Sequence, residues 1–330
     1  MSVQRVANAT NTTINSKGEF MSAFKLHCGV LAVALLLAAT ETNAATVYVN
    51  CGARVGLTTI GAAIKAVQFA GPSTINVSGA CHENVVIQSL DRLTLNAVNG
   101  ASVSDASGGK QDVISIYDSR DVAINGFAIN AGSDGVSGAN GISCNDWSMC
   151  RLSMNVIQGA GSGAGFAVFQ AAQATVDGDT FQNNGNGLIA NSGTKVRSGG
   201  QARPLVSRGN GTGISTGRQG LIYAAAIVEN NSNRGVLVQF NSTLELYGGS
   251  ISHNGGVGAE VREGSIARFT GGIAITNNVG AGVLIHDLSM VTFDATVTGN
   301  GGGTDVVCNP QYSATRGAAD TGGTTNCVEP

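Results

Sequence analysis

The chain has 330 residues, 12% of them charged, and a net charge of −3. That length allows one large domain or two ordinary ones, and the weak negative charge excludes the basic footprint of a nucleic-acid-binding protein. The 48 glycines accompany only four prolines and no three-residue period, which excludes collagen, and the 42% apolar content argues against disorder. This composition is typical of many short strands joined by tight turns.

The N-terminal region predicts export. Met21 is followed by Lys25, by an apolar run over residues 30–39 and by small residues at 42–44, which together have the form of a secretory signal peptide. The run is too short to span a bilayer. We interpret residues 1–44 as an upstream extension plus signal peptide with the true start at Met21, the alternative being a buried first helix. We expect a secreted, periplasmic or cell-surface protein with no transmembrane span after signal removal.

The cysteines support export. Cys28 lies inside the signal, and six remain: Cys51, Cys81, Cys144, Cys150, Cys308 and Cys327. An even number in an exported chain predicts disulfides, although six cysteines allow 15 connectivities. Pairing of sequence neighbours is the simplest choice, and the pairs Cys51–Cys81 and Cys308–Cys327 would then fasten the two ends of the fold. Metal binding by cysteine is less favoured because the sequence has no C-x-x-C pair.

A glycine followed by alternating apolar residues recurs along the middle and end of the chain. It begins at Gly141, Gly165, Gly187, Gly213, Gly235, Gly258, Gly282 and Gly303, with successive spacings of 24, 22, 26, 22, 23, 24 and 21. A fixed period in this range indicates a solenoid, and the alternation with β-branched residues indicates strands rather than helices. The sequence therefore predicts an all-β, single-domain, right-handed parallel β-helix solenoid of about ten coils of roughly 23 residues.

An asparagine precedes six of these glycines by three or four residues. The six are Asn184, Asn210, Asn231, Asn254, Asn278 and Asn300. Asparagine tolerates a left-handed backbone, and stacked amides can hydrogen-bond from one coil to the next. We interpret the series as a structural ladder rather than a ligand site.

The two ends of a solenoid need covering, because an open end exposes strand edges and apolar core. Residues 59–67 predict a short amphipathic cap helix. We expect an N-terminal cap with the first strands over residues 45–84, β-helix coils over 85–307 and a disulfide-pinned tail over 308–330.

Two segments carry a resemblance to a known group of proteins. The predicted helix followed by residues 75–85, which end in Glu83-Asn84-Val85, resembles the N-terminal cap and first coil of the pectin-lyase-like superfamily. Residues 121–129 are similar to another recurring coil of that group. The superfamily contains polysaccharide lyases, epimerases, esterases and hydrolases, phage tailspikes and repeat proteins without assigned activity. The catalytic signatures of its methylesterases, polygalacturonases and epimerases are missing here, so the resemblance implies a fold and no particular activity.

Candidate site residues follow from the predicted alternation of inward and outward side chains. One outward row contains Ser143, Ala167, Ile189, Ser215, Leu237, Glu260, Leu284 and Asp305, and the next contains Asn145, Phe169, Asn191, Gly217, Gln239, Arg262 and His286. Glu260, Arg262, His286 and Asp305 are the candidates for acid–base catalysis on an acidic sugar. Glu263 and Asp287, one coil apart, are candidate Ca²⁺ ligands. An ordinary solvated sheet face is the competing interpretation.

Two functions remain open at this point. Trp147 and Phe169 could stack on sugar rings while Arg262 and His286 meet carboxylates, which predicts a non-catalytic glycan-binding or surface module with polysaccharide as its partner and no cofactor other than a possible Ca²⁺. The alternative is a lyase or epimerase acting on a uronate glycan. Absent catalytic motifs and near-minimal turns favour the first, because long turns build the walls of a β-helix cleft.

Overall fold

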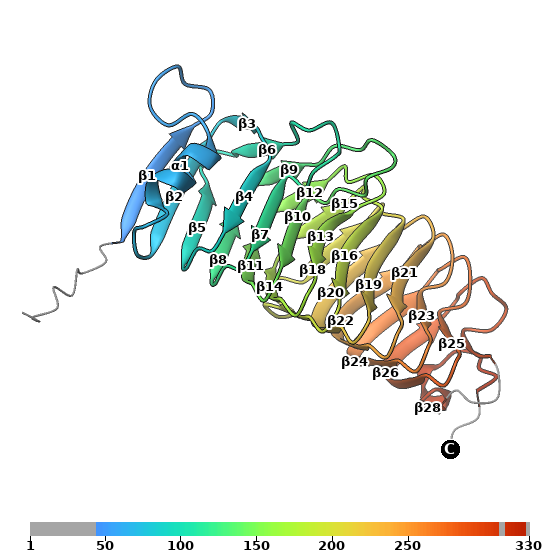
Figure 1. The fold of residues 1–330 in the computed structure, drawn as a ribbon. Coiled ribbons are helices and arrows are strands. Elements are labelled where there is room, and N and C mark those ends of the chain that lie inside the picture. Colours follow the sequence, from blue (N-terminus) through green and yellow to red (C-terminus); the bar gives the residue numbers. More distant parts are fainter. Residues whose placement is uncertain (1–43, 310–313, 328–330) are drawn as a thin grey trace, which may run out of the picture. The chain divides into compact units, whose positions relative to one another are not determined.

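The computed structural model describes residues 44–309 and 314–327. The predicted signal peptide lies outside these residues, so its cleavage stays a prediction. Each coil contributes strands to the same sheets, and each strand pairs in parallel with its counterpart one coil further on, as the succession of strands in Figure 1 shows. No helix within the described ranges is long and apolar enough to cross a membrane.

The sheet that we call the first sheet has ten strands in sequence order. They are β4 (Val85–Gln88), β7 (Ile114–Tyr117), β10 (Ile142–Asn145), β13 (Ala164–Val168), β16 (Asn186–Asn191), β19 (Thr212–Gly217), β21 (Arg234–Val238), β23 (Ala259–Val261), β25 (Val283–Ile285) and β27 (Val306–Cys308).

The remaining strands form the other two walls of each coil, which we call the second and third sheets although the long strands of the later coils join them into one 18-stranded sheet. The second sheet contains β1 (Ala45–Asn50), β2 (Ser73–Ser78), β5 (Leu93–Ala97), β8 (Val122–Asn125), β11 (Met149–Ser153), β14 (Gln173–Asp177), β17 (Lys195–Ser198) and β28 (Ala314–Arg316). The third contains β3 (Ala80–His82), β6 (Ser102–Ser104), β9 (Ala128–Asn130), β12 (Val156–Gln158), β15 (Thr180–Gln182) and β18 (Leu205–Arg208). In the later coils single long strands run through both walls: β20 (Leu221–Glu229), β22 (Thr243–Ser252), β24 (Ile266–Thr276) and β26 (Met290–Thr298).

The core is a set of apolar columns inside the coils. The residue after each repeat glycine from Gly141 to Gly282 points inward, and Ile142, Phe166 and Leu188 are fully buried in register with one another. The repeat glycines allow neighbouring coils to approach one another closely. A Cβ at Gly213 would lie 2.5 Å from the carbonyl oxygen of Gly235 and 2.8 Å from the amide nitrogen of Asn231. A side chain at these positions would therefore push neighbouring coils apart.

The asparagine ladder is present as predicted. In each step the Oδ1 of one asparagine accepts from the backbone N–H and the side-chain amide of its predecessor; for Asn254 Oδ1 and Asn231 these distances are 3.1 and 2.9 Å. The prediction that a left-handed backbone explains asparagine at the ladder positions is wrong. The left-handed residue is the one before the ladder position, as at Asn230, His253 and Asn277, with φ of 56° at each. Asparagine is used at the ladder for its amide.

The register of the last coil corrects one prediction. Val306 pairs with Val283, so Asp305 stands opposite Gly282, and Val307 rather than Asp305 continues the outward row. The physical reason is the end of the ladder, where Asp305 Oδ1 accepts from the backbone and side-chain amides of Asn300, each at 3.0 Å. Burial raises the pKa of Asp305, but these bonds and those from Thr324 outweigh it and hold the pKa below its usual range.

Both ends of the solenoid are fastened. At the first coil, helix α1 (Ile60–Val67) has Thr59 as its N-cap, and the Glu83 carboxylate accepts from the backbone N–H groups of Ile60 and Gly61 at 2.7 and 3.0 Å. A carboxylate at this end also complements the helix dipole. At the other end β28 extends the second sheet, followed by the short 3-10 helix η1 (Ala319–Thr321), so the tail continues the structure.

The three disulfides join sequence neighbours as predicted. Cys51–Cys81 lies beside the cap, Cys144–Cys150 closes a turn in the middle of the chain, and Cys308–Cys327 holds the last coil.

Candidate functional site

The outward face of the first sheet carries a continuous row of side chains across the coils. The pairing of strands puts Gln88, Tyr117, Asn145, Phe169, Asn191, Gly217, Gln239, Arg262 and His286 in this row. The sequence-based row is thereby confirmed from Asn145 onward. It also gains two members at its start.

Tyr117, Asn145 and Phe169 form an aromatic notch. Tyr117 pairs with Asn145 across adjacent strands, and Phe169 follows Val168, which pairs with Cys144, so the two aromatic residues stand one coil to either side of the amide. Two coil spacings separate them by about 10 Å. Both side chains are half-buried, while Asn145 is 7% exposed. A short amide between two rings leaves a gap open to solvent.

The notch belongs to a hollow of about 420 Å³ with a polar floor. Asn145 Nδ2 donates to Ser143 Oγ at 3.1 Å at its base. The hollow is lined by Asp112, Tyr117, Asn140, Ser143, Asn145, Phe169, Gln170 and Ser192. Hydroxyl and amide groups can both donate and accept hydrogen bonds, which suits a ligand rich in hydroxyls.

Trp147 lies in the turn that leaves this part of the sheet. The Cys144–Cys150 disulfide spans the turn, and Asp146 and Trp147 both have left-handed backbone, with φ of 51° and 61°. The Trp147 side chain is 78% exposed, and its backbone N–H donates to the Gln170 carbonyl at 3.1 Å. A bulky residue in that conformation is unusual, and the disulfide holds it there beside the notch.

The predicted polar cluster also forms, and Glu260 is its centre. This carboxylate, 8% exposed, pairs with Arg234, with Arg262 at 3.3 Å and with His286 Nε2 at 3.2 Å. Arg262 Nε also donates to Gln239 Oε1 at 3.1 Å. The cluster brings Glu260, Arg262 and His286 together as expected, whereas Asp305 lies at the end of the asparagine ladder.

The contacts within the cluster limit what it can do. Both ring nitrogens of His286 already face carboxylates, since Nε2 lies 3.2 Å from Glu260 Oε1 and Nδ1 lies 3.1 Å from Asp287 Oδ2. Arg262 likewise faces Glu260 and lies 3.8 Å from Glu263. Two arginines meet three carboxylates, so the cluster offers no net positive charge to a uronate.

The calcium prediction rests on two carboxylates one coil apart. The backbone N–H after Glu263 donates to the Asp287 carbonyl at 2.8 Å, which places the two turns side by side. Glu263 Oε2 is buried without a hydrogen-bond partner in the described structure, which leaves one oxygen free for a cation. Ca²⁺ takes six to eight oxygen ligands, so these residues supply only part of such a set, and calcium binding here stays a prediction.

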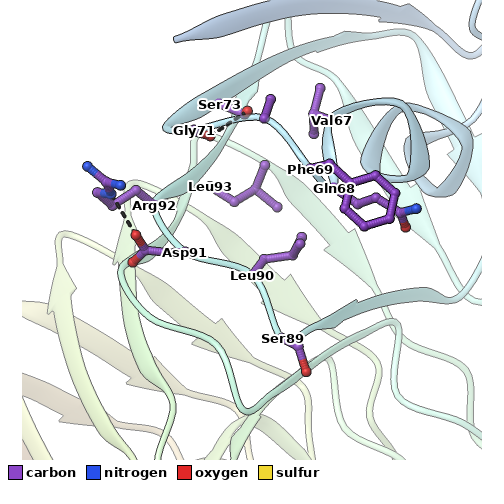
Figure 2. A pocket seen from close by; sticks show the side chains of 11 residues that line it. Val67, Gln68, Phe69, Gly71, Ser73, Ser89, Leu90, Asp91, Arg92 and Leu93 are labelled. Carbon is purple, nitrogen blue, oxygen red and sulfur yellow. Dashed lines mark hydrogen bonds and ion pairs between the residues drawn. The ribbon is translucent and has the colours of Figure 1, made fainter. Parts of the chain in front are cut away.

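A separate hollow of about 280 Å³ lies near the cap between α1 and the loop before β5. Figure 2 shows the ion pair between Asp91 and Arg92, 2.7 Å apart, on one side and the ring of Phe69 on the other. Its two charged side chains neutralise each other, and the rest of its lining mixes Val67, Leu90 and Leu93 with the polar side chains of Gln68, Ser73 and Ser89.

Tyr117 was missed in the sequence because the glycine pattern does not reach it. Val113 stands where later coils have the repeat glycine, and the spacing from Tyr117 to Asn145 is 28 residues. The alternation Ile114-Ser115-Ile116-Tyr117 was the available signal, since it repeats the inward–outward order of Ile142 to Asn145.

No family profile matches the sequence, and no curated protein matches it either. Solved structures show the fold. The A-module of mannuronan C-5 epimerase AlgE6 from Azotobacter vinelandii superposes with a TM-score of 0.61 at 13% identity, covering 78% of each chain. The A-module of AlgE4 from the same organism gives a TM-score of 0.55 at 15% identity, covering 82% of this chain and 93% of the other. The chain thus has the right-handed parallel β-helix fold that its sequence predicts.

Proposed function

We propose that the protein is an exported, non-catalytic glycan-binding β-helix whose binding site is the hollow around Tyr117, Asn145 and Phe169. The observation that carries the proposal is the pair of aromatic residues flanking a nearly buried amide on the outward face of the first sheet. An aromatic face packs well against the apolar C–H face of a pyranose, and the Asn145 amide can bond its hydroxyls. Trp147 offers a further stacking surface beside the hollow.

The continuation of the row favours an extended ligand. Asn191 and Gln239 follow Phe169 along the same line of outward positions, at intervals set by the coils. A chain of similar sugar units can meet a row of similar side chains repeatedly, whereas a compact metabolite would use one coil or two. The two similar solved structures carry the names of mannuronan C-5 epimerases, which supports a carbohydrate ligand on this type of fold.

The test is a screen of the mature protein on immobilised neutral and acidic oligosaccharides, followed by calorimetry with the best ligand. Phe169→Ala should weaken that ligand about tenfold, because a lost stacking contact is worth about 1 kcal/mol or slightly more. Phe69→Ala removes an exposed aromatic ring beside α1, outside the outward row of the first sheet, and is the matched control. If the two variants bind equally, or if the parent binds no oligosaccharide, the proposal is wrong.

A uronate lyase or epimerase is the second candidate, favoured by the presence of Arg262 and His286 on the same row. Its weakness is the contact network, in which Glu260 occupies both side chains. Incubation with uronate polymers distinguishes the two. We expect neither an unsaturated product by ultraviolet absorbance nor a change in sugar configuration by NMR, and either result would establish the enzyme.

A further inference from the structure

A third hollow lies on the outward face of the second sheet, and three of the side chains that line it are basic. It has a volume of about 410 Å³ and is lined in part by Arg151, Thr175, Lys195 and Arg197. The strand register puts Arg151, Thr175 and Arg197 in one row over three successive coils. Lys195 lies two residues before Arg197 on β17, so it faces the same side of the sheet.

The cations of this hollow are only partly neutralised. Arg151 pairs with Asp121 at 2.7 Å. Lys195 and Arg197 are both exposed, and neither has a carboxylate within 4.0 Å among the residues that the structure describes. Three cations thus share one carboxylate in a chain whose net charge is −3.

An aromatic platform continues the row beyond Arg197. Tyr223 pairs with Arg197 across the next strand, is 41% exposed and stacks on Tyr247 with ring centroids 4.4 Å apart. The row therefore presents a guanidinium, a hydroxyl, a second guanidinium and an exposed ring at steps of about 4.8 Å.

We propose that this face binds an acidic polysaccharide carrying carboxylates, with its chain lying along the row from Arg151 to Tyr223. An arginine fork grips a carboxylate bidentately, and Arg151 and Arg197 stand about 10 Å apart, as two carboxylates on separate sugar units of one chain would. Thr175 can bond hydroxyls between them, and Tyr223 stacks on the next sugar. Three cations are few for a nucleic acid, whose binding involves many phosphate contacts. The site is independent of the hollow on the first sheet.

The test compares Lys195→Ala/Arg197→Ala with Arg268→Ala, which removes an exposed cation from the same row beyond Tyr223. The probe is a uronate oligosaccharide, measured by calorimetry at about 50 and 200 mM salt. The double variant should bind at least ~10-fold more weakly, Arg268→Ala should bind like the parent, and the parent's affinity should fall with salt. The methyl-esterified oligosaccharide, which has lost its charges, should not bind the parent at this face.

Several results would overturn the proposal. One is equal binding of the uronate chain by the parent and the double variant. Another is no uronate binding by the parent at all. A third is that a single-stranded oligonucleotide or anionic vesicles bind more tightly than the uronate chain and lose that binding in the double variant. Phe169→Ala is an internal control, because it changes only the first-sheet hollow. Its effect on binding therefore tests the first-sheet site separately from the site on the second sheet.

Discussion

Removing one amide from the asparagine ladder should destabilise the whole β-helix. Asn254 is fully buried, and its Oδ1 accepts from the backbone and side-chain amides of Asn231. Its Nδ2 donates to the Val228 carbonyl at 3.3 Å and to Asn278 Oδ1 at 2.8 Å. Asn254→Ala deletes all four bonds and leaves the backbone N–H of Asn231 buried without the partner that it has in the parent. At about 1 kcal/mol per bond, with the desolvation cost added, the expected loss is about 3–5 kcal/mol.

Urea unfolding followed by circular dichroism measures this loss, and calorimetry should show a melting temperature lower by about 5–10 °C for a domain of this size. Asn233→Ala is the control, since Asn233 is exposed and lies two residues from the ladder. It should change the free energy of unfolding by less than about 0.5 kcal/mol. An Asn254→Ala protein as stable as that control would refute the idea that ladder hydrogen bonds stabilise the fold.

Three further changes have defined outcomes. Burial raises the pKa of Asp179 to about 6 despite hydrogen bonds from Asn155, so the stability that this group adds is complete below about pH 4 and is lost as the pH rises through about 6. From the acidic to the basic end of that window, the free energy of unfolding should fall by about 3 kcal/mol more in the parent than in Asp179→Asn. Parallel pH profiles of the two proteins would contradict this. Replacing Cys144 and Cys150 with serine should cost about 2 kcal/mol in the chain-entropy picture and weaken glycan binding, and a variant that unfolds and binds like the oxidised parent would show that the disulfide constrains nothing. Calcium should raise the melting temperature of the parent and not of Glu263→Gln, and an unchanged parent would exclude the calcium site.

The fold was predictable because its signals repeat. From Gly141 to Gly282 each coil has a glycine followed by an inward apolar residue, and most of these coils also carry a ladder amide, so an error in one coil did not matter. The last coil shows where this reasoning failed. Asp305 follows a glycine like the other outward positions, but its carboxylate terminates the ladder and shifts the register by two residues.

The candidate site was only partly predictable. Glu260, Arg262 and His286 do lie together, because Glu260 and Arg262 are two residues apart in one coil and His286 follows Arg262 by one coil. The spacing could not show that these side chains already pair with one another. The network also depends on Arg234, which stands at the start of its strand and outside both predicted rows. Tyr117 was missed because the first coils lack the repeat glycine. The local sequence pattern predicted which side chains point outward. Contacts between coils determine which of those side chains are free to bind a ligand.

A crystal structure of the mature protein with its tightest-binding oligosaccharide would show where the glycan binds. We expect a sugar ring between Tyr117 and Phe169, with a hydroxyl bonded to the Asn145 amide and the chain continuing along the outward row of the first sheet. An oligosaccharide bound elsewhere, with the notch holding only water, would contradict this expectation.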